Sequence, residues 1–126
     1  MKINFHQKVI IKKGDKFLAL KASYKGLRWD LPGGAVEIPE THEKALLREI
    51  EEETNLNISG LTPVEVSTGF NPETDEYFIF IGWQCNAASD KVTLSGEHTE
   101  YKWVTKDEFL GLEATDYLKE FVKKHL

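Results

Sequence analysis

The sequence predicts an α/β fold in which a mixed β-sheet is packed between helices. Two segments, residues 41–54 and 114–126, have the apolar spacing of amphipathic helices. Runs rich in valine, isoleucine, phenylalanine and tyrosine come before and after the first of these helices and read as strands. Strands and helices in this order bury their apolar faces against each other, so we expect layers of helix, sheet and helix.

Two strands with a turn between them are expected near the N-terminus, at residues 5–12 and 17–20, with the turn at 13–16. A second turn at 23–26 leads into an extended stretch, 29–37, that is interrupted by adjacent glycines. The first pair predicts a β-hairpin, and the glycines predict a sharply bent backbone after it.

The first helix is expected to run from about Thr41 to Thr54. Thr41 is the expected N-cap, with Lys44 at the position where an acid would complete a capping box. Asn55 follows the helix and tolerates the left-handed conformation that commonly ends one.

The second half of the chain predicts another hairpin and a last helix. Strand-like residues 61–70 and 76–85 flank a turn at 71–75. A further strand is expected at 100–105, before the helix at 114–126.

Composition places the protein among globular proteins. The 126 residues, 40% hydrophobic and 29% charged, predict one domain spanning 1–126, and no run approaches the roughly 18 apolar residues of a membrane span. The N-terminus lacks the uninterrupted apolar core of a secretory signal. We expect a cytoplasmic protein with no membrane partner, as a monomer or a homodimer. The single cysteine, Cys85, is expected to be an inert core thiol.

The net charge of −5 argues against binding to extended nucleic acid, which normally requires a basic patch. It is compatible with a small phosphorylated ligand when a metal ion bridges the two anions, because the cation then dominates the local charge.

Three glutamates in the first predicted helix, Glu49, Glu52 and Glu53, are the main candidates for a functional site. Their spacing of three and four residues places them on one helix face, where each repulsive pair costs roughly 0.2–0.5 kcal/mol. A hard divalent cation such as Mg²⁺ would compensate this repulsion. The plain alternative is an acidic face that is simply solvated.

The spacing around these glutamates closely resembles the Nudix box, the signature of the Nudix hydrolase family. In that family the pattern is Gly, five residues, Glu, seven residues, Arg-Glu, an aliphatic residue, any residue, Glu-Glu, any residue, Gly and an aliphatic residue. Residues 34–56 match every specified position except the final glycine, which is Asn55 here. Trp29 and Leu31-Pro32-Gly33-Gly34 resemble the strand that enters the box, and residues 97–104 resemble the closing region of many such domains.

The resemblance implies the family's α/β/α sandwich fold and assigns a role to each matching residue. The expected metal ligands are the carboxylates of Glu49, Glu52, Glu53 and Glu97 and the backbone carbonyl of Gly33. Structural support is expected from Gly34 and from an ion pair between Glu40 and Arg48.

The implied reaction is hydrolysis of a nucleoside diphosphate linked to a moiety X, with Mg²⁺, or Mn²⁺ in its place, activating the attacking water. The catalytic residues are expected to be Glu49, Glu52 and Glu97. Glu52, Glu97 and Glu100 are all candidates for the general base, with Glu52 favoured inside the box and Glu97 outside it. Nucleoside and deoxynucleoside triphosphates rank first as substrates, dinucleoside polyphosphates second, and ADP-ribose and capped RNA after them.

Substrate contacts are expected from Trp29, Arg28, His98 and Tyr77. Flat aromatic walls suit a nucleobase and basic side chains suit phosphate. Tyr24, Phe70, Lys8 and Lys21 are further candidates, and core packing or plain solvated charge is the alternative for each.

Two other functions stay open at this point. One is a nucleotide-binding domain of the same family without hydrolytic activity. The other is a structural domain whose acidic helix binds Ca²⁺ or a basic partner.

Overall fold

The structure, a computed structural model, describes residues 1–22 and 28–126, so the expected turn at 23–26 and Tyr24 lie outside the described residues. The elements follow one another along the chain as β1 (Lys2–Lys13), β2 (Lys16–Ala22), β3 (Trp29–Asp30), β4 (Gly33–Ala35), α1 (His42–Thr54), β5 (Ile58–Asn71), β6 (Glu76–Ala87), β7 (His98–Val104), α2 (Lys106–Leu110) and α3 (Asp116–His125).

The strands form one mixed sheet, as the sequence predicts. Its main order is β3-β2-β1-β6-β5, with β4 paired to β1 and β7 paired to β2. β1 and β6 run parallel, whereas every other strand pair in the described residues is antiparallel. The parallel pair joins the N-terminal strands to the β5–β6 hairpin, which comes after α1 in the chain.

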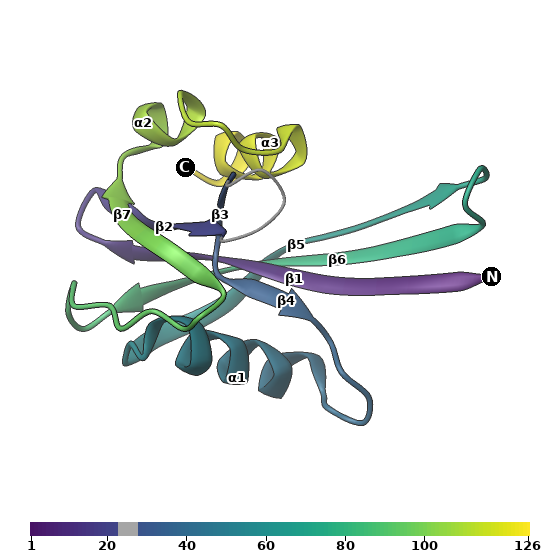
Figure 1. The fold of residues 1–126 in the computed structure, drawn as a ribbon, viewed down its shortest axis with the longest axis horizontal. Coiled ribbons are helices and arrows are strands. Elements are labelled where there is room, and N and C mark those ends of the chain that lie inside the picture. The colour runs from purple at the N-terminus through teal and green to yellow at the C-terminus, as the bar shows by residue number, and fades with distance from the viewer. Residues whose placement is uncertain (23–27) are drawn as a thin grey trace.

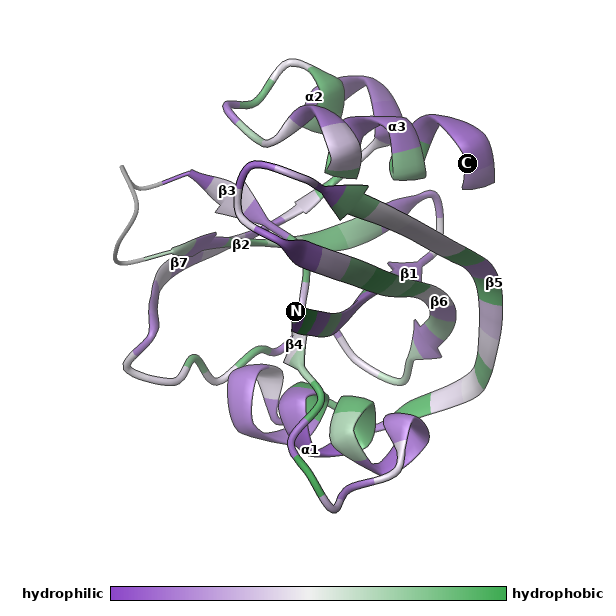
Figure 2. Cartoon of the chain, turned by 90° about the vertical axis from the view of Figure 1, so that its right-hand side faces the viewer, coloured by the Kyte–Doolittle hydropathy of each residue, from purple (hydrophilic) through white to green (hydrophobic). Residues whose placement is uncertain are grey.

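Helices cover both faces of this sheet, which confirms the predicted α/β/α layers. α1 lies on one side, and α2 and α3 lie on the other (Figures 1 and 2). The alternation of side chains along β1 divides the core accordingly. Val9 and Ile11 pack in the cluster that contains Leu46 and Ile50 of α1, whereas Ile10 packs in the cluster with Phe121 of α3.

A buried glutamine fixes the start of α1 against the sheet. Gln7 of β1 donates through Nε2 to the carbonyl oxygen of His42 at 2.7 Å and accepts at Oε1 from the indole of Trp83 at 2.9 Å. Its side chain is buried, so both ends of the amide need these partners. The contact positions the first turn of α1 over β1 and β6.

The predicted ends of α1 are confirmed. The Thr41 hydroxyl accepts from the backbone N–H of Lys44, and Asn55 adopts φ 53° and ψ 29° while its N–H donates to the carbonyl of Glu51. Asparagine is among the few residues that adopt this left-handed conformation at little cost, which explains how the chain departs from the box glycine and still ends its helix there.

The short helix α2 is not predicted from the apolar pattern. It has five residues, too few to show a helical period, but Thr105 and Glu108 form a reciprocal capping box at its start. The sequence feature that indicates α2 is therefore the Thr-x-x-Glu spacing of Thr105 and Glu108. The last helix begins at Asp116, two residues later than expected, and β5 begins at Ile58, three residues earlier.

The cysteine prediction is confirmed. Cys85 is buried, and this burial raises the pKa of its thiol to about 12. A thiol in that environment stays protonated and unreactive. Among the helices of the described residues, none has the length and apolar character that a bilayer crossing requires.

The left-handed conformation of Asn55 makes a stability prediction. Asn55→Gly should leave the free energy of unfolding within about 1 kcal/mol of the parent value, because glycine adopts this conformation readily. Asn55→Val should cost about 1–2 kcal/mol, since a β-branched side chain is strained there. Thermal melts followed by circular dichroism measure both. Equal melting temperatures for the two variants would contradict the assignment of Asn55 as the left-handed C-cap of α1.

Candidate active site

Two glycines bring the backbone of β4 close to β1 and α1. Gly33 has φ +135°, and a Cβ atom there would collide with the backbone of Gln7. A Cβ atom at Gly34 would lie 2.9 Å from the carboxylate carbon of Glu49. Only glycine fits at Gly33, and a side chain at Gly34 would displace the carboxylate of Glu49, so the Pro-Gly-Gly turn can lie directly against the acidic helix.

Glu53 connects that turn to α1. Its carboxylate is buried, and Oε1 accepts a hydrogen bond from the backbone N–H of Gly33 at 2.8 Å. Burial raises the pKa of Glu53 to about 8, and the charges of Glu49 and Asp30 add to the rise, while the Gly33 hydrogen bond and the charge of Lys8 oppose it. A buried carboxylate in these surroundings is poorly compensated by the protein alone.

Glu49 is a partly buried acid of the same site. Its side chain is only 15% exposed. Burial is the largest cause of the raised pKa of Glu49, the charges of Glu52 and Glu97 also raise it, and Arg48 lowers it. Glu49, Glu52 and Glu97 therefore lie near enough to feel each other's charge.

Arg48 folds back over the acidic face and pairs with several carboxylates. It donates to Glu40 through Nε at 2.7 Å and Nη2 at 2.9 Å, a bidentate contact that forms the predicted ion pair. Its Nη1 lies 3.2 Å from Glu49 and 3.1 Å from Glu52. The hydrogen bonds from Arg48 lower the pKa of Glu40. The arginine fixes the loop before α1 to the helix that carries the acids.

The predicted convergence of Glu49, Glu52 and Glu53 on one metal ion stays a prediction, because the three carboxylates have different partners in this structure. Within residues 1–22 and 28–126, no group of three acidic, histidine or cysteine side chains already surrounds a common point. Arg48 attracts Glu52, which is 57% exposed, towards its own guanidinium, and Gly33 holds Glu53 inward. The donor chemistry fits a hard cation, because oxygen ligands of the preferred type lie on one helix face, where Glu53 is buried and Glu49 is partly buried.

The loop before β7 packs against the end of α1. The backbone N–H of Thr93 donates to the carbonyl of Thr54, and the indole of Trp103 donates to the carbonyl of Asp90. These contacts hold the loop that carries Glu97 beside the acidic helix, and Glu97 contributes to the raised pKa of Glu49. The structure therefore brings Glu97 to the site as the sequence predicts.

Glu100 and His98 are placed differently from Glu97. Glu100 pairs with Lys21 of β2 at 3.6 Å, so the general-base candidate furthest along the chain is already in an ion pair. The buried side chain of His98 has Nε2 at 3.8 Å from Oε2 of Glu53, and its Nδ1 has no hydrogen-bond partner within the described part of the chain. His98 thus contacts the buried acid.

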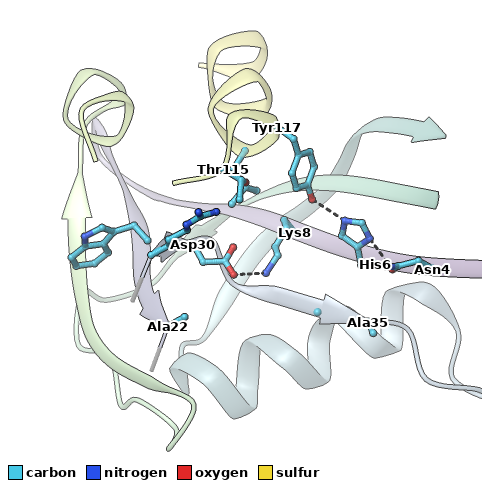
Figure 3. Close-up of a pocket in the computed structure, with 12 residues that line it drawn as sticks. Asn4, His6, Lys8, Ala22, Asp30, Ala35, Thr115 and Tyr117 are labelled. Carbon is cyan, nitrogen blue, oxygen red and sulfur yellow. Dashed lines mark hydrogen bonds and ion pairs between the residues drawn. The ribbon is translucent and has the colours of Figure 1, made fainter. Parts of the chain in front are cut away.

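A pocket of about 370 Å³ opens beside the glycine turn (Figure 3). Gly34 and Ala35 line it at one side, and Lys8 and Asp30 lie across its floor. Lys8 Nζ donates to Asp30 Oδ2 at 3.0 Å and to the carbonyl of Leu31 at 3.2 Å. Because Gly34 also contacts Glu49, the pocket and the acids share the glycine turn as a common wall.

Two of the four predicted substrate residues line this pocket, and two do not. Trp29 and Arg28 are part of its wall, as is Lys8. His98 is buried next to Glu53 instead. Tyr77 is also outside the lining, because it lies near the start of β6, in register with Ile3 and Phe70 at the far end of the sheet.

The sequence did not single out five polar residues of the pocket, which are Asn4, His6, Asp30, Thr115 and Tyr117. Asn4 and His6 are two residues apart on β1, so a strand at this position places both side chains on one face. Tyr117 lies within the apolar stripe that predicts the last helix. No local motif connects it to β1, because 111 residues separate it from His6.

Comparison with known proteins supports one family. The NUDIX domain model matches residues 7–124. A nucleoside triphosphatase NudI from Enterobacter is 32% identical over 120 residues, covering 86% of this chain and 85% of that protein. A MutT-like protein from Streptomyces ambofaciens is 30% identical over 100 residues, covering 79% of this chain but only 62% of the relative. The crystal structure of a MutT NUDIX hydrolase from Burkholderia pseudomallei superposes with a TM-score of 0.84 at 22% identity, covering 100% of both chains.

The Glu40–Arg48 contact predicts a pH-dependent stability. The pKa of Glu40 is lowered below its ordinary 4.5 in the folded protein, so the stabilisation is present above that ordinary value and is lost as the pH falls through the lowered pKa. Wild type should therefore have a higher melting temperature than Glu40→Gln at pH 7, and the difference between the two melting temperatures should disappear below about pH 4.5. Melting temperatures between pH 7 and pH 3 measure it.

Glu73→Gln provides the matched control, because Glu73 is exposed in the turn between β5 and β6 and its carboxylate has no ion pair in the described residues. Its melting temperature should follow that of wild type at every pH. A difference between wild type and Glu40→Gln that stays constant from pH 7 to pH 3 would contradict the assignment.

Proposed function

The chain belongs to the Nudix hydrolase family, and we propose that it hydrolyses the pyrophosphate bond of a nucleoside diphosphate linked to a moiety X, with a nucleoside or deoxynucleoside triphosphate as the substrate. The observation that carries this proposal is that the Gly33-Gly34 turn lies between the pocket and the carboxylates of Glu49 and Glu53. Gly34 lines the pocket on one side and contacts the carboxylate of Glu49 on the other. A nucleoside in the pocket would present its phosphates to the acidic face of α1.

Glu49, Glu52 and Glu53, with the Gly33 carbonyl and Glu97, are the groups that would hold Mg²⁺, or Mn²⁺ in its place. When bound, the metal supplies charge stabilisation to the phosphate oxygens and lowers the pKa of a water ligand. The support for this assignment is the burial of Glu53 and the partial burial of Glu49, which raise the pKa values of both carboxyl groups and favour a cation beside them.

The chain's own residues position this chemistry. Gly33 fixes Glu53 through its N–H, and Arg48 fixes Glu40 against α1. The general base would be Glu52 or Glu97, since Glu52 is exposed on the helix and Glu97 lies in the adjoining loop. Either carboxylate would take the proton of the attacking water.

The pocket has the features of a nucleotide site. Its volume of about 370 Å³ lies in the range for small-molecule sites, about 300–1,000 Å³. The side chain of Trp29 supplies an aromatic wall, and Lys8 and Arg28 supply positive charge on the way to the acids. The NudI relative, a nucleoside triphosphatase by name, supports triphosphates as the first substrates to test.

The test is a chromatographic screen for monophosphate and pyrophosphate release from each nucleoside and deoxynucleoside triphosphate, with Mg²⁺ and with Mn²⁺. Diadenosine tetraphosphate and ADP-ribose complete the panel. Glu52→Gln should lower kcat by about 100-fold or more, because it removes a metal ligand or base. Glu51→Gln, one residue away on the exposed side of the same helix, should match wild type.

The possible outcomes separate the alternatives. Wild-type turnover of no substrate, with tight nucleotide binding by calorimetry, would replace the proposed hydrolase with a non-catalytic nucleotide-binding domain. Equal loss of activity in Glu51→Gln and Glu52→Gln would contradict the specific role of Glu52. Binding of Ca²⁺ with no nucleotide binding would favour a structural acidic helix.

A further inference from the structure

Beyond the reaction itself, the pocket has a far wall formed by three polar side chains from two elements. Asn4 and His6 come from β1, and Tyr117 comes from the first turn of α3 (Figure 3). His6 Nδ1 lies 3.2 Å from Asn4 Oδ1, and His6 Nε2 lies 3.0 Å from the Tyr117 hydroxyl. The three side chains therefore form a continuous hydrogen-bonded row.

The direction of these hydrogen bonds follows from the chemistry of the groups. The amide oxygen of Asn4 can only accept, so His6 Nδ1 donates to it. Burial, with the nearby charge of Lys8, lowers the pKa of His6, although Asp30 partly opposes this, so the ring is neutral at pH 7. A neutral ring protonated at Nδ1 accepts at Nε2, and Tyr117 must donate its hydroxyl proton to His6.

This direction leaves a defined polar pattern facing the pocket. The Tyr117 oxygen retains its capacity to accept, and the Asn4 amide nitrogen retains two N–H donors; within the described residues neither has a further partner. The acceptor on α3 and the donors on β1 lie at opposite ends of the row, with the His6 ring between them, so they can bond two different polar groups of a nucleobase.

The wall is also held rigidly. The Tyr117 ring packs edge-on against Phe80 with 4.9 Å between ring centroids, and His6 lies 5.4 Å from the same ring. Phe80 in turn packs against Phe121 of α3. A side chain that is fixed in this way can discriminate between ligands, because it does not adapt to the wrong one.

His6 and Tyr117 separate the pocket from a second cavity. A groove of about 440 Å³ lies on their other side, lined also by Phe78, Phe80 and the backbone of Gly69. The two side chains therefore set the depth of the pocket, and removing the tyrosine ring would join the two spaces.

From this arrangement we propose that Asn4, His6 and Tyr117 are the base-recognition residues of this chain: the row hydrogen-bonds polar groups of the nucleobase and limits its size. The proposal rests on the proposed function, because it places the nucleoside in this pocket with its phosphates towards Glu49 and Glu53.

The test measures base selectivity, the ratio of kcat/KM for the best and the poorest of the triphosphates that differ only in base. Tyr117→Phe removes the acceptor while keeping the ring, and it should change this ratio by about tenfold, the effect of one neutral hydrogen bond. His6→Leu should have a similar effect. The double variant should be no worse than either single one, because the residues act as a unit.

Tyr101→Phe is the matched control, since Tyr101 lies on β7 outside the pocket and is 39% exposed against 40% for Tyr117. Its selectivity should equal that of wild type. A ratio for Tyr117→Phe within twofold of wild type would overturn the proposal.

A second variant tests the limit on size. Tyr117→Ala should raise the kcat/KM for N6-benzyl-ATP relative to ATP, because the benzyl group could then enter the groove beyond the wall. An unchanged ratio in a folded protein would contradict the role of Tyr117 in limiting the size of the base.

If wild type hydrolyses no nucleotide, the proposed function fails, and calorimetry of the same nucleotides then tests the base-recognition proposal. Base-selective binding that Tyr117→Phe removes would support the proposal. Binding without base preference would overturn it.

Discussion

The hydrogen bond from the backbone N–H of Gly33 to the buried carboxylate of Glu53 is the contact on which the rest of the site depends. It connects β4 to α1 where a side chain on either glycine would collide with its neighbours. Without it, the acidic helix and the pocket floor would be independent surfaces. With it, Glu49 and Glu53 are held beside the pocket that Gly34 lines.

Holding the carboxylates of Glu49 and Glu53 close together away from solvent has an electrostatic cost, and the fold offsets only part of this cost. Burial raises the pKa values of Glu49 and Glu53, and Arg48 and Lys8 supply the nearest positive charges. Arg48 also holds Glu40 bidentately, so it serves as a structural clamp as well as a counter-ion. The remaining imbalance is the physical reason to expect a divalent cation, and it makes an acidic protein compatible with a polyphosphate ligand.

Local patterns predicted most of the fold and the acidic half of the site. Thr41 and Asn55 bound α1 as expected, and the spacing of Gly34, Glu40 and Arg48 predicted an ion pair that the structure contains. The convergence of the three glutamates on one metal ion stays a prediction, and helical spacing alone does not reveal that the guanidinium of Arg48 pairs with the carboxylate of Glu52. The pocket wall formed by Asn4, His6 and Tyr117 also could not be predicted from the sequence. His6 and Tyr117 meet only because α3 packs on the face of the sheet that carries the side chain of His6, a tertiary contact with no local signal.

The measurement that tests this account most directly is a crystal structure with Mg²⁺ and a non-hydrolysable nucleoside triphosphate analogue. The account predicts metal density on the carboxylates of Glu49, Glu52 and Glu53, with Glu52 turned away from Arg48. It also predicts a nucleoside in the pocket, between Trp29 and the hydrogen-bonded row of Asn4, His6 and Tyr117. A nucleotide bound elsewhere, or a metal held without these glutamates, would contradict the claim that the glycine turn joins one metal site to one nucleotide pocket.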